Sequence, residues 1–282
     1  MRLIEIMMIR LPSLLDVIKI STMISVELQY HSFFGRHSVK AECPETWGEM
    51  SEEQFLLLAL QSQGGFVRDE DFFHIMFGIP RNIAKRLDSW YKYVLEKKAK
   101  YLRSDKPAVN HFFIKKLGKL KAPADMLQGV SLQQFMTVDT YFSLASEELG
   151  TAVTPKLDMM VASLYLQKNQ AYSVADNDKK HKLLDLMANV RLTSKESADY
   201  KWAIYLNWSM IRNWLSNAYP LLFPAPDKEE QNNKKKQSTQ WLEIYDSFVG
   251  DDIAHSEAYQ TMERLMHSAL WSEEYEKRKN QN

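Results

Sequence analysis

The stretch YKWAIYLNWSMIRNWL, residues 200–215, decides the fold because it predicts a helix that is apolar on every side. Its three tryptophans and its other large apolar side chains do not keep to one stripe of the helical circumference. A helix of this kind has to be covered by other elements of the protein. We therefore expect residues 200–215 to form the central helix of a mainly α protein.

The composition of the whole chain fits a protein with its own hydrophobic core. The chain has 282 residues, of which 45% are hydrophobic, and it contains nine glycines and nine prolines. This length can bury a sizeable core, and so few glycine and proline residues predict few tight turns. The formal net charge is zero, which argues against a surface built as a whole to attract nucleic acid or anionic lipid. The single cysteine, Cys43, rules out a disulfide within the chain and fits a cytoplasmic protein.

Residues 1–22 read as an apolar N-terminal extension. Charged residues interrupt it at intervals far shorter than the roughly 20 residues that a membrane-spanning helix needs. Arg10 and Pro12 also interrupt the apolar run that a signal peptide needs. Two interpretations stay open: a true extension, or a mis-annotated start with Met23 as the first residue.

Residues 23–48 carry the pattern of a β-hairpin. Apolar and polar residues alternate over residues 24–30 and again over residues 39–43. This period of two is typical of half-buried strands, and Gly35 between the two runs can supply the turn. We predict a short N-terminal β-hairpin.

Residues 49–223 carry the patterns of a helical body. Ser51 and Gln54 form a capping-box pattern ahead of an apolar run, and Ser131 and Gln134 repeat it. In such a box the serine hydroxyl accepts a bond from the backbone amide of the glutamine, whose side chain reaches back to the serine. We expect a helix to start at each of the two places.

Three further helices are predicted within the same region. The carboxylates of residues 69–71 suit the first turn of a helix, where the helix dipole favours negative charge. Apolar residues recur near a 3.6-residue period from Ile83 to Tyr101, which predicts one long amphipathic helix that starts after Pro80. The apolar stripe over residues 157–165 predicts another helix.

The C-terminal region divides into a linker and a tail. Residues 224–238, PAPDKEEQNNKKKQS, contain no large apolar side chain and cannot repay the entropy of ordering, so we interpret them as a disordered linker. Residues 239–282 carry apolar residues at helical spacing but are too few for a core of their own. This helical C-terminal tail either docks on the body or waits for a partner, and we predict that its removal leaves a folded body that cannot assemble. The candidate partner-binding side chains of the tail are Trp241, Ile244, Tyr245 and Phe248.

Catalytic and metal-binding motifs give little support for an enzyme. The chain lacks the common phosphate-binding loops and the nucleophile elbow of esterases. A carboxylate and a histidine lie three residues apart within residues 69–74 and again within residues 251–255, but carboxylates favour the first turn of a helix without any metal. We predict a protein that is not an enzyme and holds no metal or cofactor. A hydrolase or nuclease at these two clusters is the weakest alternative.

Charge is distributed unevenly along the chain. Residues 42–80 contain eight acidic residues and one basic residue, whereas residues 81–121 contain thirteen basic residues and three acidic ones. In the second segment aromatic residues are interleaved with cations, as in a groove that binds nucleic acid by stacking. The other interpretation is that the two segments neutralise each other while the aromatic residues fill the core. The candidate nucleic-acid-binding cations are Lys85, Arg86, Lys92, Lys97, Lys98, Lys100, Arg103, Lys115 and Lys116.

Four phrases, in this order along the chain, carry a resemblance to a known group of proteins. They are PETWGEMSEEQF at 44–55, VSLQQFM at 130–136, MVASLY at 160–165 and WLEIY at 241–245. Together they resemble tail-region proteins encoded in the virion-gene clusters of tailed phages and prophages, especially those of Bacteroidetes hosts. Related sequences often carry Arg-Pro after the Leu-Tyr phrase, whereas here Leu166 and Gln167 follow.

The resemblance implies a non-enzymatic protein of virion assembly. The place of such genes near tail genes implies a tail-assembly chaperone or a minor tail component, located in the host cytoplasm or in the virion. The implied partners are other virion proteins, including a helical tape-measure protein. A homo-oligomer stays open as a further alternative. Soft methionine side chains suit a surface that adapts to such a client. A nucleic-acid-binding accessory protein that uses residues 81–121 is the alternative.

Overall fold

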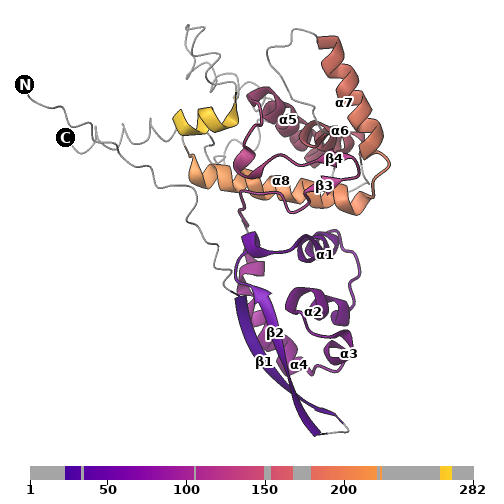
Figure 1. Ribbon diagram of the computed structural model, residues 1–282, viewed down its shortest axis with the longest axis vertical. Helices are drawn as coiled ribbons and strands as arrows, with labels where there is room; N and C mark the ends of the chain where they lie inside the picture. Colours follow the sequence, from indigo (N-terminus) through magenta and orange to yellow (C-terminus); the bar gives the residue numbers. More distant parts are fainter. Residues whose placement is uncertain are drawn as a thin grey trace, which may run out of the picture.

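The computed structural model describes residues 23–32, 35–104, 106–148, 154–167, 179–220, 223 and 261–268. Within these ranges the chain is mainly α-helical and begins with a two-stranded antiparallel hairpin, which confirms the predicted fold class. The elements lie in two lobes, one above the other in Figure 1. We name residues 23–104 the hairpin lobe, and residues 106–223 together with 261–268 the α8 lobe. Among the helices of the described ranges, none has the length and apolar character needed to cross a membrane.

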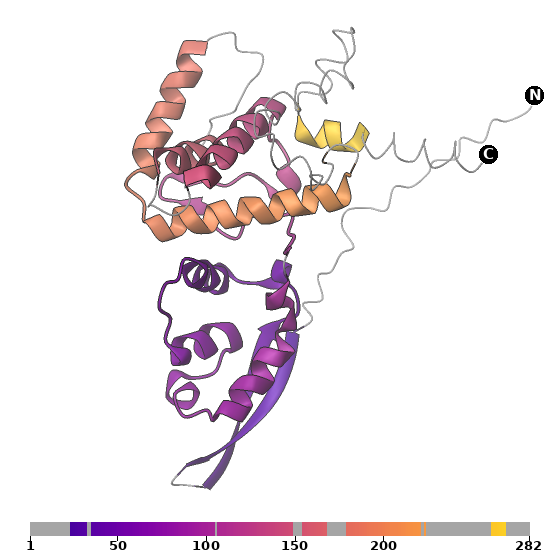
Figure 2. The same ribbon diagram turned by 180° about the vertical axis from the view of Figure 1, so that it is seen from behind.

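The hairpin lobe packs helices against a long β-hairpin. The second strand contacts α2 and the first strand contacts α4, so the hairpin forms one wall of the lobe. Figure 2 shows the hairpin extending past the helices at the end farthest from the α8 lobe. The elements are β1 (Met23–Ser32), β2 (Gly35–Pro44), η1 (Trp47–Glu49), α1 (Glu52–Ser62), α2 (Asp69–Phe77), α3 (Arg81–Ala84), α4 (Ser89–Lys98) and η2 (Lys100–Arg103).

The hairpin follows the predicted alternation. Strands β1 and β2 pair with Ile24 opposite Cys43 and with Leu28 opposite Val39. Leu28 and Cys43 are buried, because successive side chains of a strand point to opposite faces and the apolar set faces the helices. Gly35 has a φ of +116°, which glycine adopts without the strain that a side chain brings. The predicted β-hairpin is therefore confirmed.

The start of α1 has the predicted capping box. The amide of Gln54 donates to Ser51 Oγ at 3.2 Å, and the amide of Ser51 donates to Gln54 Oε1 at 3.0 Å. These bonds satisfy two backbone groups that the first helical turn leaves without a partner inside the helix. Gln54 Nε2 also donates to the carbonyls of Ile75 and Met76, both at 3.2 Å. One side chain thus caps α1 and ties it to the end of α2.

The single long helix expected from Ile83 to Tyr101 is wrong. The chain forms the short helix α3, breaks, and starts again as α4. Asp88 lies at the break with an extended backbone, and its side chain accepts a bond from the amide of Tyr91 at 2.9 Å. An aspartate in this position is a strong N-cap, and its extended backbone cannot continue a preceding helix.

The α8 lobe surrounds one long helix. Helix α8 contacts α6 within this lobe and α1 of the hairpin lobe, and Trp208 at its middle is completely buried. The central helix predicted from residues 200–215 is therefore confirmed. Three short strands form an antiparallel sheet in the order β3-β4-β5. The elements are β3 (Lys116–Leu117), β4 (Leu120–Lys121), η3 (Asp125–Leu127), α5 (Leu132–Glu148), α6 (Pro155–Leu164), β5 (Leu166–Gln167), α7 (Lys179–Thr193) and α8 (Ala198–Ala218).

Polar contacts in the interior join α8 to its neighbours. Lys201 Nζ of α8 lies 2.8 Å from Asp158 Oδ1 of α6, with 6% and 15% of the two side chains exposed. Ser194, just after α7, donates through its hydroxyl to Asp158 Oδ2 at 3.0 Å. Arg212 Nε of α8 lies 2.9 Å from Asp139 Oδ1 of α5. Because a buried charge without a partner is very unfavourable, the buried pair of Lys201 and Asp158 fixes how α8 packs against α6.

The two lobes meet where α1 packs against α8. The rings of Phe55 and Phe113 stack with their centroids 4.2 Å apart. Trp202 Nε1 of α8 donates to the hydroxyl of Ser62, the last residue of α1, at 3.0 Å. Aromatic stacking and a hydrogen bond therefore both connect the lobes.

Candidate partner-binding surface

Helix α4 holds two aromatic side chains in solvent. Trp90 is 65% exposed and Tyr93 is 51% exposed, and their ring centroids lie 6.1 Å apart. Residues three positions apart share one face of a helix, so the two rings form one patch. Tyrosine and tryptophan are enriched at interfaces, so this pair is a candidate for contact with another molecule.

One cation contacts this aromatic pair, and other exposed cations lie before and after it along the chain. Lys97 Nζ lies 5.9 Å from the centroid of the Tyr93 ring, within the range of a cation–π interaction. Lys85 and Arg86 are exposed just before the helix. We define the α4 surface as Lys85, Arg86, Trp90, Tyr93 and Lys97. The candidate cations Lys98, Lys100 and Arg103 are also exposed, at and beyond the C-terminal end of α4.

Two other cations of the basic segment pair with acidic residues of the preceding segment. Lys92 Nζ lies 2.7 Å from Asp69 Oδ2, and Arg81 Nε lies 2.9 Å from Asp71 Oδ1. Asp71 also accepts a bond from Arg68, which together with the nearby Arg81 holds the pKa of that carboxyl below its ordinary value. The predicted neutralisation of one segment by the other is confirmed for these pairs. Lys92 therefore ties α4 to α2 instead of facing a partner.

The basic segment is split between the lobes. Lys115 and Lys116 lie beside and within β3 of the α8 lobe, and Lys115 Nζ lies 2.5 Å from Asp125 Oδ1. Phe112 and Phe113 are buried in the core, so they offer no stacking face to a nucleic acid. Of the candidate set, Lys97 contacts the aromatic pair, the other exposed cations of the hairpin lobe lie before α4 or at and beyond its C-terminal end, and Lys115 and Lys116 lie at β3 in the α8 lobe.

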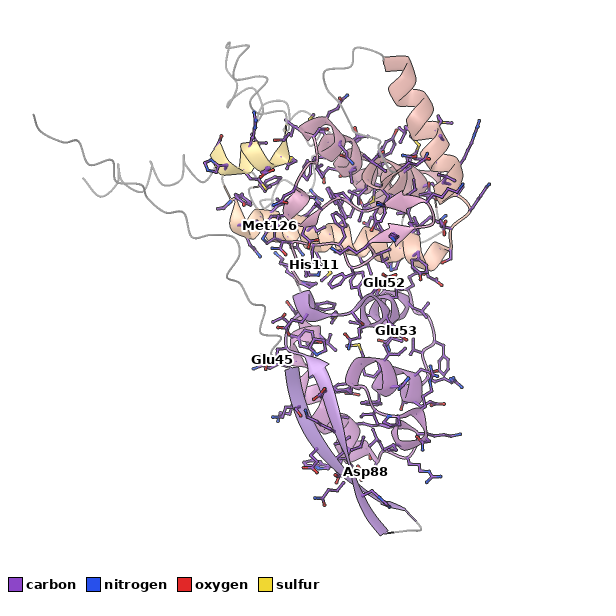
Figure 3. All side chains as sticks on the ribbon, in the orientation of Figure 1. Glu45, Glu52, Glu53, Asp88, His111 and Met126 are labelled. Atoms are coloured by element: carbon purple, nitrogen blue, oxygen red, sulfur yellow. The ribbon has the colours of Figure 1, made fainter. Side chains whose placement is uncertain are left out.

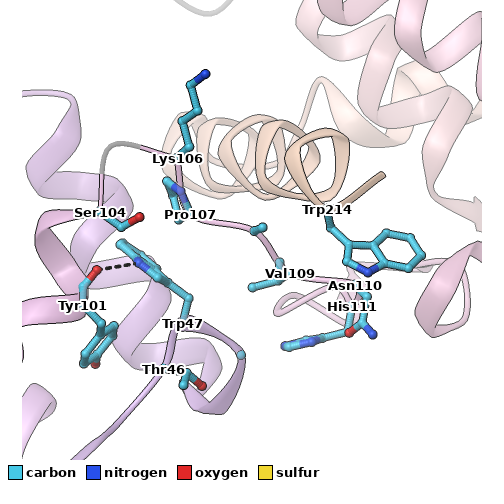
Figure 4. A pocket seen from close by; sticks show the side chains of 12 residues that line it. Thr46, Trp47, Tyr101, Ser104, Lys106, Pro107, Val109, Asn110, His111 and Trp214 are labelled. Atoms are coloured by element: carbon cyan, nitrogen blue, oxygen red, sulfur yellow. Dashed lines mark hydrogen bonds between the residues drawn. The ribbon is translucent and has the colours of Figure 1, made fainter. Parts of the chain in front are cut away.

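A hollow of about 480 Å³ lies where the two lobes meet (Figure 4). Trp47 lines it from the hairpin lobe, Trp214 lines it from α8, and His111 lies between the lobes (Figure 3). Trp47 Nε1 donates to the carbonyl of Tyr101 at 2.9 Å, which fixes the indole ring. Lys106 adds a cation to this mainly apolar lining. Because its walls come from separate segments of the chain, spacing in the sequence gave no signal for this hollow.

Part of the C-terminal tail docks on the α8 lobe. Thr261 forms an isolated antiparallel bridge with Ser131, and residues 262–268 form a short helix with buried apolar side chains. Docking, one of the two alternatives for the tail, is therefore confirmed for this part of it. Several other expectations lie outside the described residues: the extension over residues 1–22, the linker over residues 224–238, and the candidate side chains Trp241, Ile244, Tyr245 and Phe248.

Titratable groups do not gather into a metal centre within the described residues, where no three His, Cys, Asp or Glu side chains lie close enough to hold an ion. In the first carboxylate–histidine cluster, His74 Nδ1 lies 2.9 Å from the carbonyl of Ile79, and Asp71 is occupied by two arginines. The second cluster, residues 251–255, lies outside the described residues. Burial raises the pKa of the Cys43 thiol to about 11, so the nucleophilic thiolate is scarce at neutral pH.

Comparisons with known proteins add no assignment. No known protein family matches the chain, and no curated protein or solved structure matches it either. The functional proposal therefore rests on the geometry of the α4 surface and on the resemblance of the sequence phrases.

Proposed function

We propose that this chain is a non-enzymatic assembly protein of a tailed phage or prophage particle, either a tail-assembly chaperone or a minor tail component. Its partner is another virion protein, for which a helical tape-measure protein is the leading candidate, and it works in the host cytoplasm or in the virion. The observation that carries the proposal is the exposed pair Trp90 and Tyr93 on α4. Tryptophan and tyrosine dominate the binding energy of protein interfaces when a partner covers them.

The setting of the pair supports a protein-binding role. Asp88 caps α4 at its start, and Leu95 of α4 is completely buried in the core. Trp90 and Tyr93 are therefore presented on a fixed backbone, which lowers the entropy that binding has to overcome. Side chains on a rigid helix suit recognition of a repetitive helical client.

The resemblance supplies the class of partner. Its first three phrases cover the ends of β2 and the start of α1, the start of α5, and the second half of α6. These are places where helices begin or pack, so the phrases support a fold shared with the tail-region proteins that the sequence resembles. The α4 surface lies outside the phrases, as a surface specific to one client would.

A pull-down of the tagged full chain from cells that express the neighbouring virion genes, with nuclease added, tests the proposal. We expect a virion protein to be recovered with the wild type. The double variant Trp90→Ala and Tyr93→Ala should lose at least about tenfold of it, because both rings would be interface anchors. The matched control is Phe66→Ala, which removes another aromatic ring of the same lobe that is 87% exposed. Recovery that is equal for both variants, or no virion protein at all, would contradict the proposal.

Binding of nucleic acid is a second candidate function for the same surface. It is favoured by Lys97 beside Tyr93 and by the basic composition of the segment, since aromatic rings in a basic setting stack on bases of single strands. A gel-retardation assay with single-stranded DNA in a salt series measures it, because phosphate contacts lose affinity steeply as salt rises. Lys97→Ala should weaken such binding, whereas Lys116→Ala, in the other lobe, should not. Retardation that both substitutions weaken equally would favour a role for the whole segment from 81 to 121.

A further inference from the structure

The docked part of the tail is a short amphipathic helix. Thr261 starts it, and the amide of Arg264 donates to the hydroxyl of Thr261 at 3.4 Å. Met262, Leu265 and Met266 are buried, at the i, i+3 and i+4 positions that share one face of a helix. The polar residues between them face solvent. The segment is thus held by three apolar side chains on one face.

The backbone fixes where this helix docks. The amide of Met262 donates to the carbonyl of Val130 at 3.0 Å, and Thr261 bridges Ser131. A segment bound here therefore pairs through one residue with the start of α5 and is helical from the next residue on. We name Val130, Ser131 and Leu132 the α5 docking site.

The start of α5 is buried where the equivalent start of α1 is exposed. Both helices begin after the pattern S-x-x-Q-F, but α1 opens with Glu52, which is exposed, whereas α5 opens with Leu132, which is buried. The two serines differ likewise, since Ser51 is exposed whereas Ser131 is buried. The same local pattern thus opens with a buried apolar residue at α5, next to the two residues that contact Thr261 and Met262.

The backbone just before the docking site is strained. Met126 and Leu127 both have φ near +57°, in the left-handed region that residues with side chains rarely adopt. Leu127 is buried and its carbonyl accepts a bond from the amide of Val130 at 3.1 Å. Strain of this kind persists where the surroundings impose it, and it gathers at binding sites.

The tail helix makes only a small contact with the α8 lobe. Two helical turns are too short to be stable alone, so the segment is a helix because it is docked. Because the segment belongs to the same chain, it competes for the site intramolecularly, at a raised effective concentration.

We infer that the α5 docking site receives an amphipathic helix of the protein partner, and that residues 261–268 are the chain's own occupant, which the partner displaces. The fitting partner helix carries Met or Leu at i, i+3 and i+4 directly after a Ser or Thr, as the present occupant does. The inference rests on the proposed function only for the source of that helix, a client protein of the virion. Exchange at the site is a property of this chain and is tested on the chain alone.

The experiment uses a fluorescent peptide of residues 257–270, EAYQTMERLMHSAL, added to the full chain and followed by fluorescence anisotropy. Leu265→Asp places a charge on the buried face and releases the chain's own segment. We expect this variant to bind the peptide at least about tenfold more tightly than the wild type, because the tethered competitor is gone. The matched control Arg264→Asp changes an exposed residue of the same helix and should behave as the wild type.

A second arm leaves every buried residue unchanged. A protease site inserted within residues 224–238 of the full chain is cut after folding, which removes the tether. The cut chain should then exchange its tail for the peptide, whereas the uncut chain should not. Equal binding by wild type and Leu265→Asp, or no exchange after cutting, would overturn the inference. A wild-type dimer in light scattering that Leu265→Asp abolishes would also overturn it, since the occupant would then come from a second copy.

Discussion

Two helix pairs of this protein, α1 with α2 and α5 with α6, are joined by the same kind of glutamine hydrogen bond, which is more buried in the second pair. In each pair a glutamine three residues after a serine crosses to the carbonyls at the end of the next helix: Gln54 to Ile75 and Met76, and Gln134 to Ser163 and Leu164. Gln134 is almost fully buried, whereas Gln54 is partly exposed. The same sequence pattern therefore sets a helix start in both lobes, and burial decides how much stability depends on it.

The ion pairs of the two helix pairs differ in the same direction. Asp158 of α6 meets Lys201 in the interior of the α8 lobe. Asp71 of α2 meets Arg68 and Arg81 at the surface of the hairpin lobe. Buried pairs fix packing, whereas exposed pairs contribute little. The interior pair therefore contributes to the packing of the α8 lobe, whereas the surface pairs add little to the stability of the hairpin lobe.

The largest effect should come from Asp158→Ala. It leaves the ammonium group of Lys201 buried without its partner, and removing one member of a buried pair costs about 3–5 kcal/mol. Urea unfolding followed by far-ultraviolet circular dichroism measures the loss. The matched control is Asp71→Ala, for which we expect an almost unchanged midpoint. Similar losses from both substitutions would break the comparison.

A smaller effect is expected from Gln134→Ala. The substitution removes the donor for the carbonyls of Ser163 and Leu164 in a buried place, which costs about 1–3 kcal/mol. Gln54→Ala, its counterpart in α1, should cost less, because water can replace a donor at a partly exposed site. Thermal melts of the two variants give the difference directly, and a greater loss for Gln54→Ala would contradict the account.

How far the sequence predicts these pairs depends on the distance between partners. Helix starts at Ser51 and Ser131 were predicted because a cap is a local pattern, and the β-hairpin was predicted because alternation is local. Lys201 and Asp158 lie in two different helices whose sequences are mainly apolar. Their contact depends on tertiary packing, so no local spacing in the sequence predicts it. The break at Asp88 was missed because the apolar period of the surrounding residues continues through it.

The candidate surface was predicted in part for the same reason. Trp90 and Tyr93 lay in the candidate segment, but so did Phe112 and Phe113, which are buried. Composition and charge mark all four equally, and only tertiary packing separates them. The docked tail helix had a local signal in the spacing of Met262, Leu265 and Met266, but its docking site at the start of α5 had none.

The stability of the protein should depend on pH through the buried Cys43 of the hairpin. Burial raises the pKa of the Cys43 thiol from about 9 to about 11. Below pH 9 the thiol is protonated in both states, whereas between pH 9 and 11 the unfolded chain loses the proton first. Stability should therefore fall as pH rises through this window. Urea midpoints of wild type and Cys43→Ala should show a shallower fall for the variant, and equal slopes would contradict the burial.

The smallest change in stability should come from Trp90→Ala with Tyr93→Ala. Both side chains are largely in solvent, so the double variant should stay within about 0.5 kcal/mol of the wild type. Thermal melting measures it. A large loss would mean that the two rings support the fold of the hairpin lobe, and would remove them as candidates for partner binding.

Hydrogen–deuterium exchange of the chain, free and bound to the virion protein recovered with it, tests the division of roles most directly. The account predicts slow exchange in α6 and α8 in both states, because the α8 lobe is held by its interior. Amides of α4 over residues 89–98 should gain protection in the complex, because the partner covers the outer face of this helix. Unchanged exchange in α4, with protection confined to other elements, would contradict the assignment of the α4 surface to the partner.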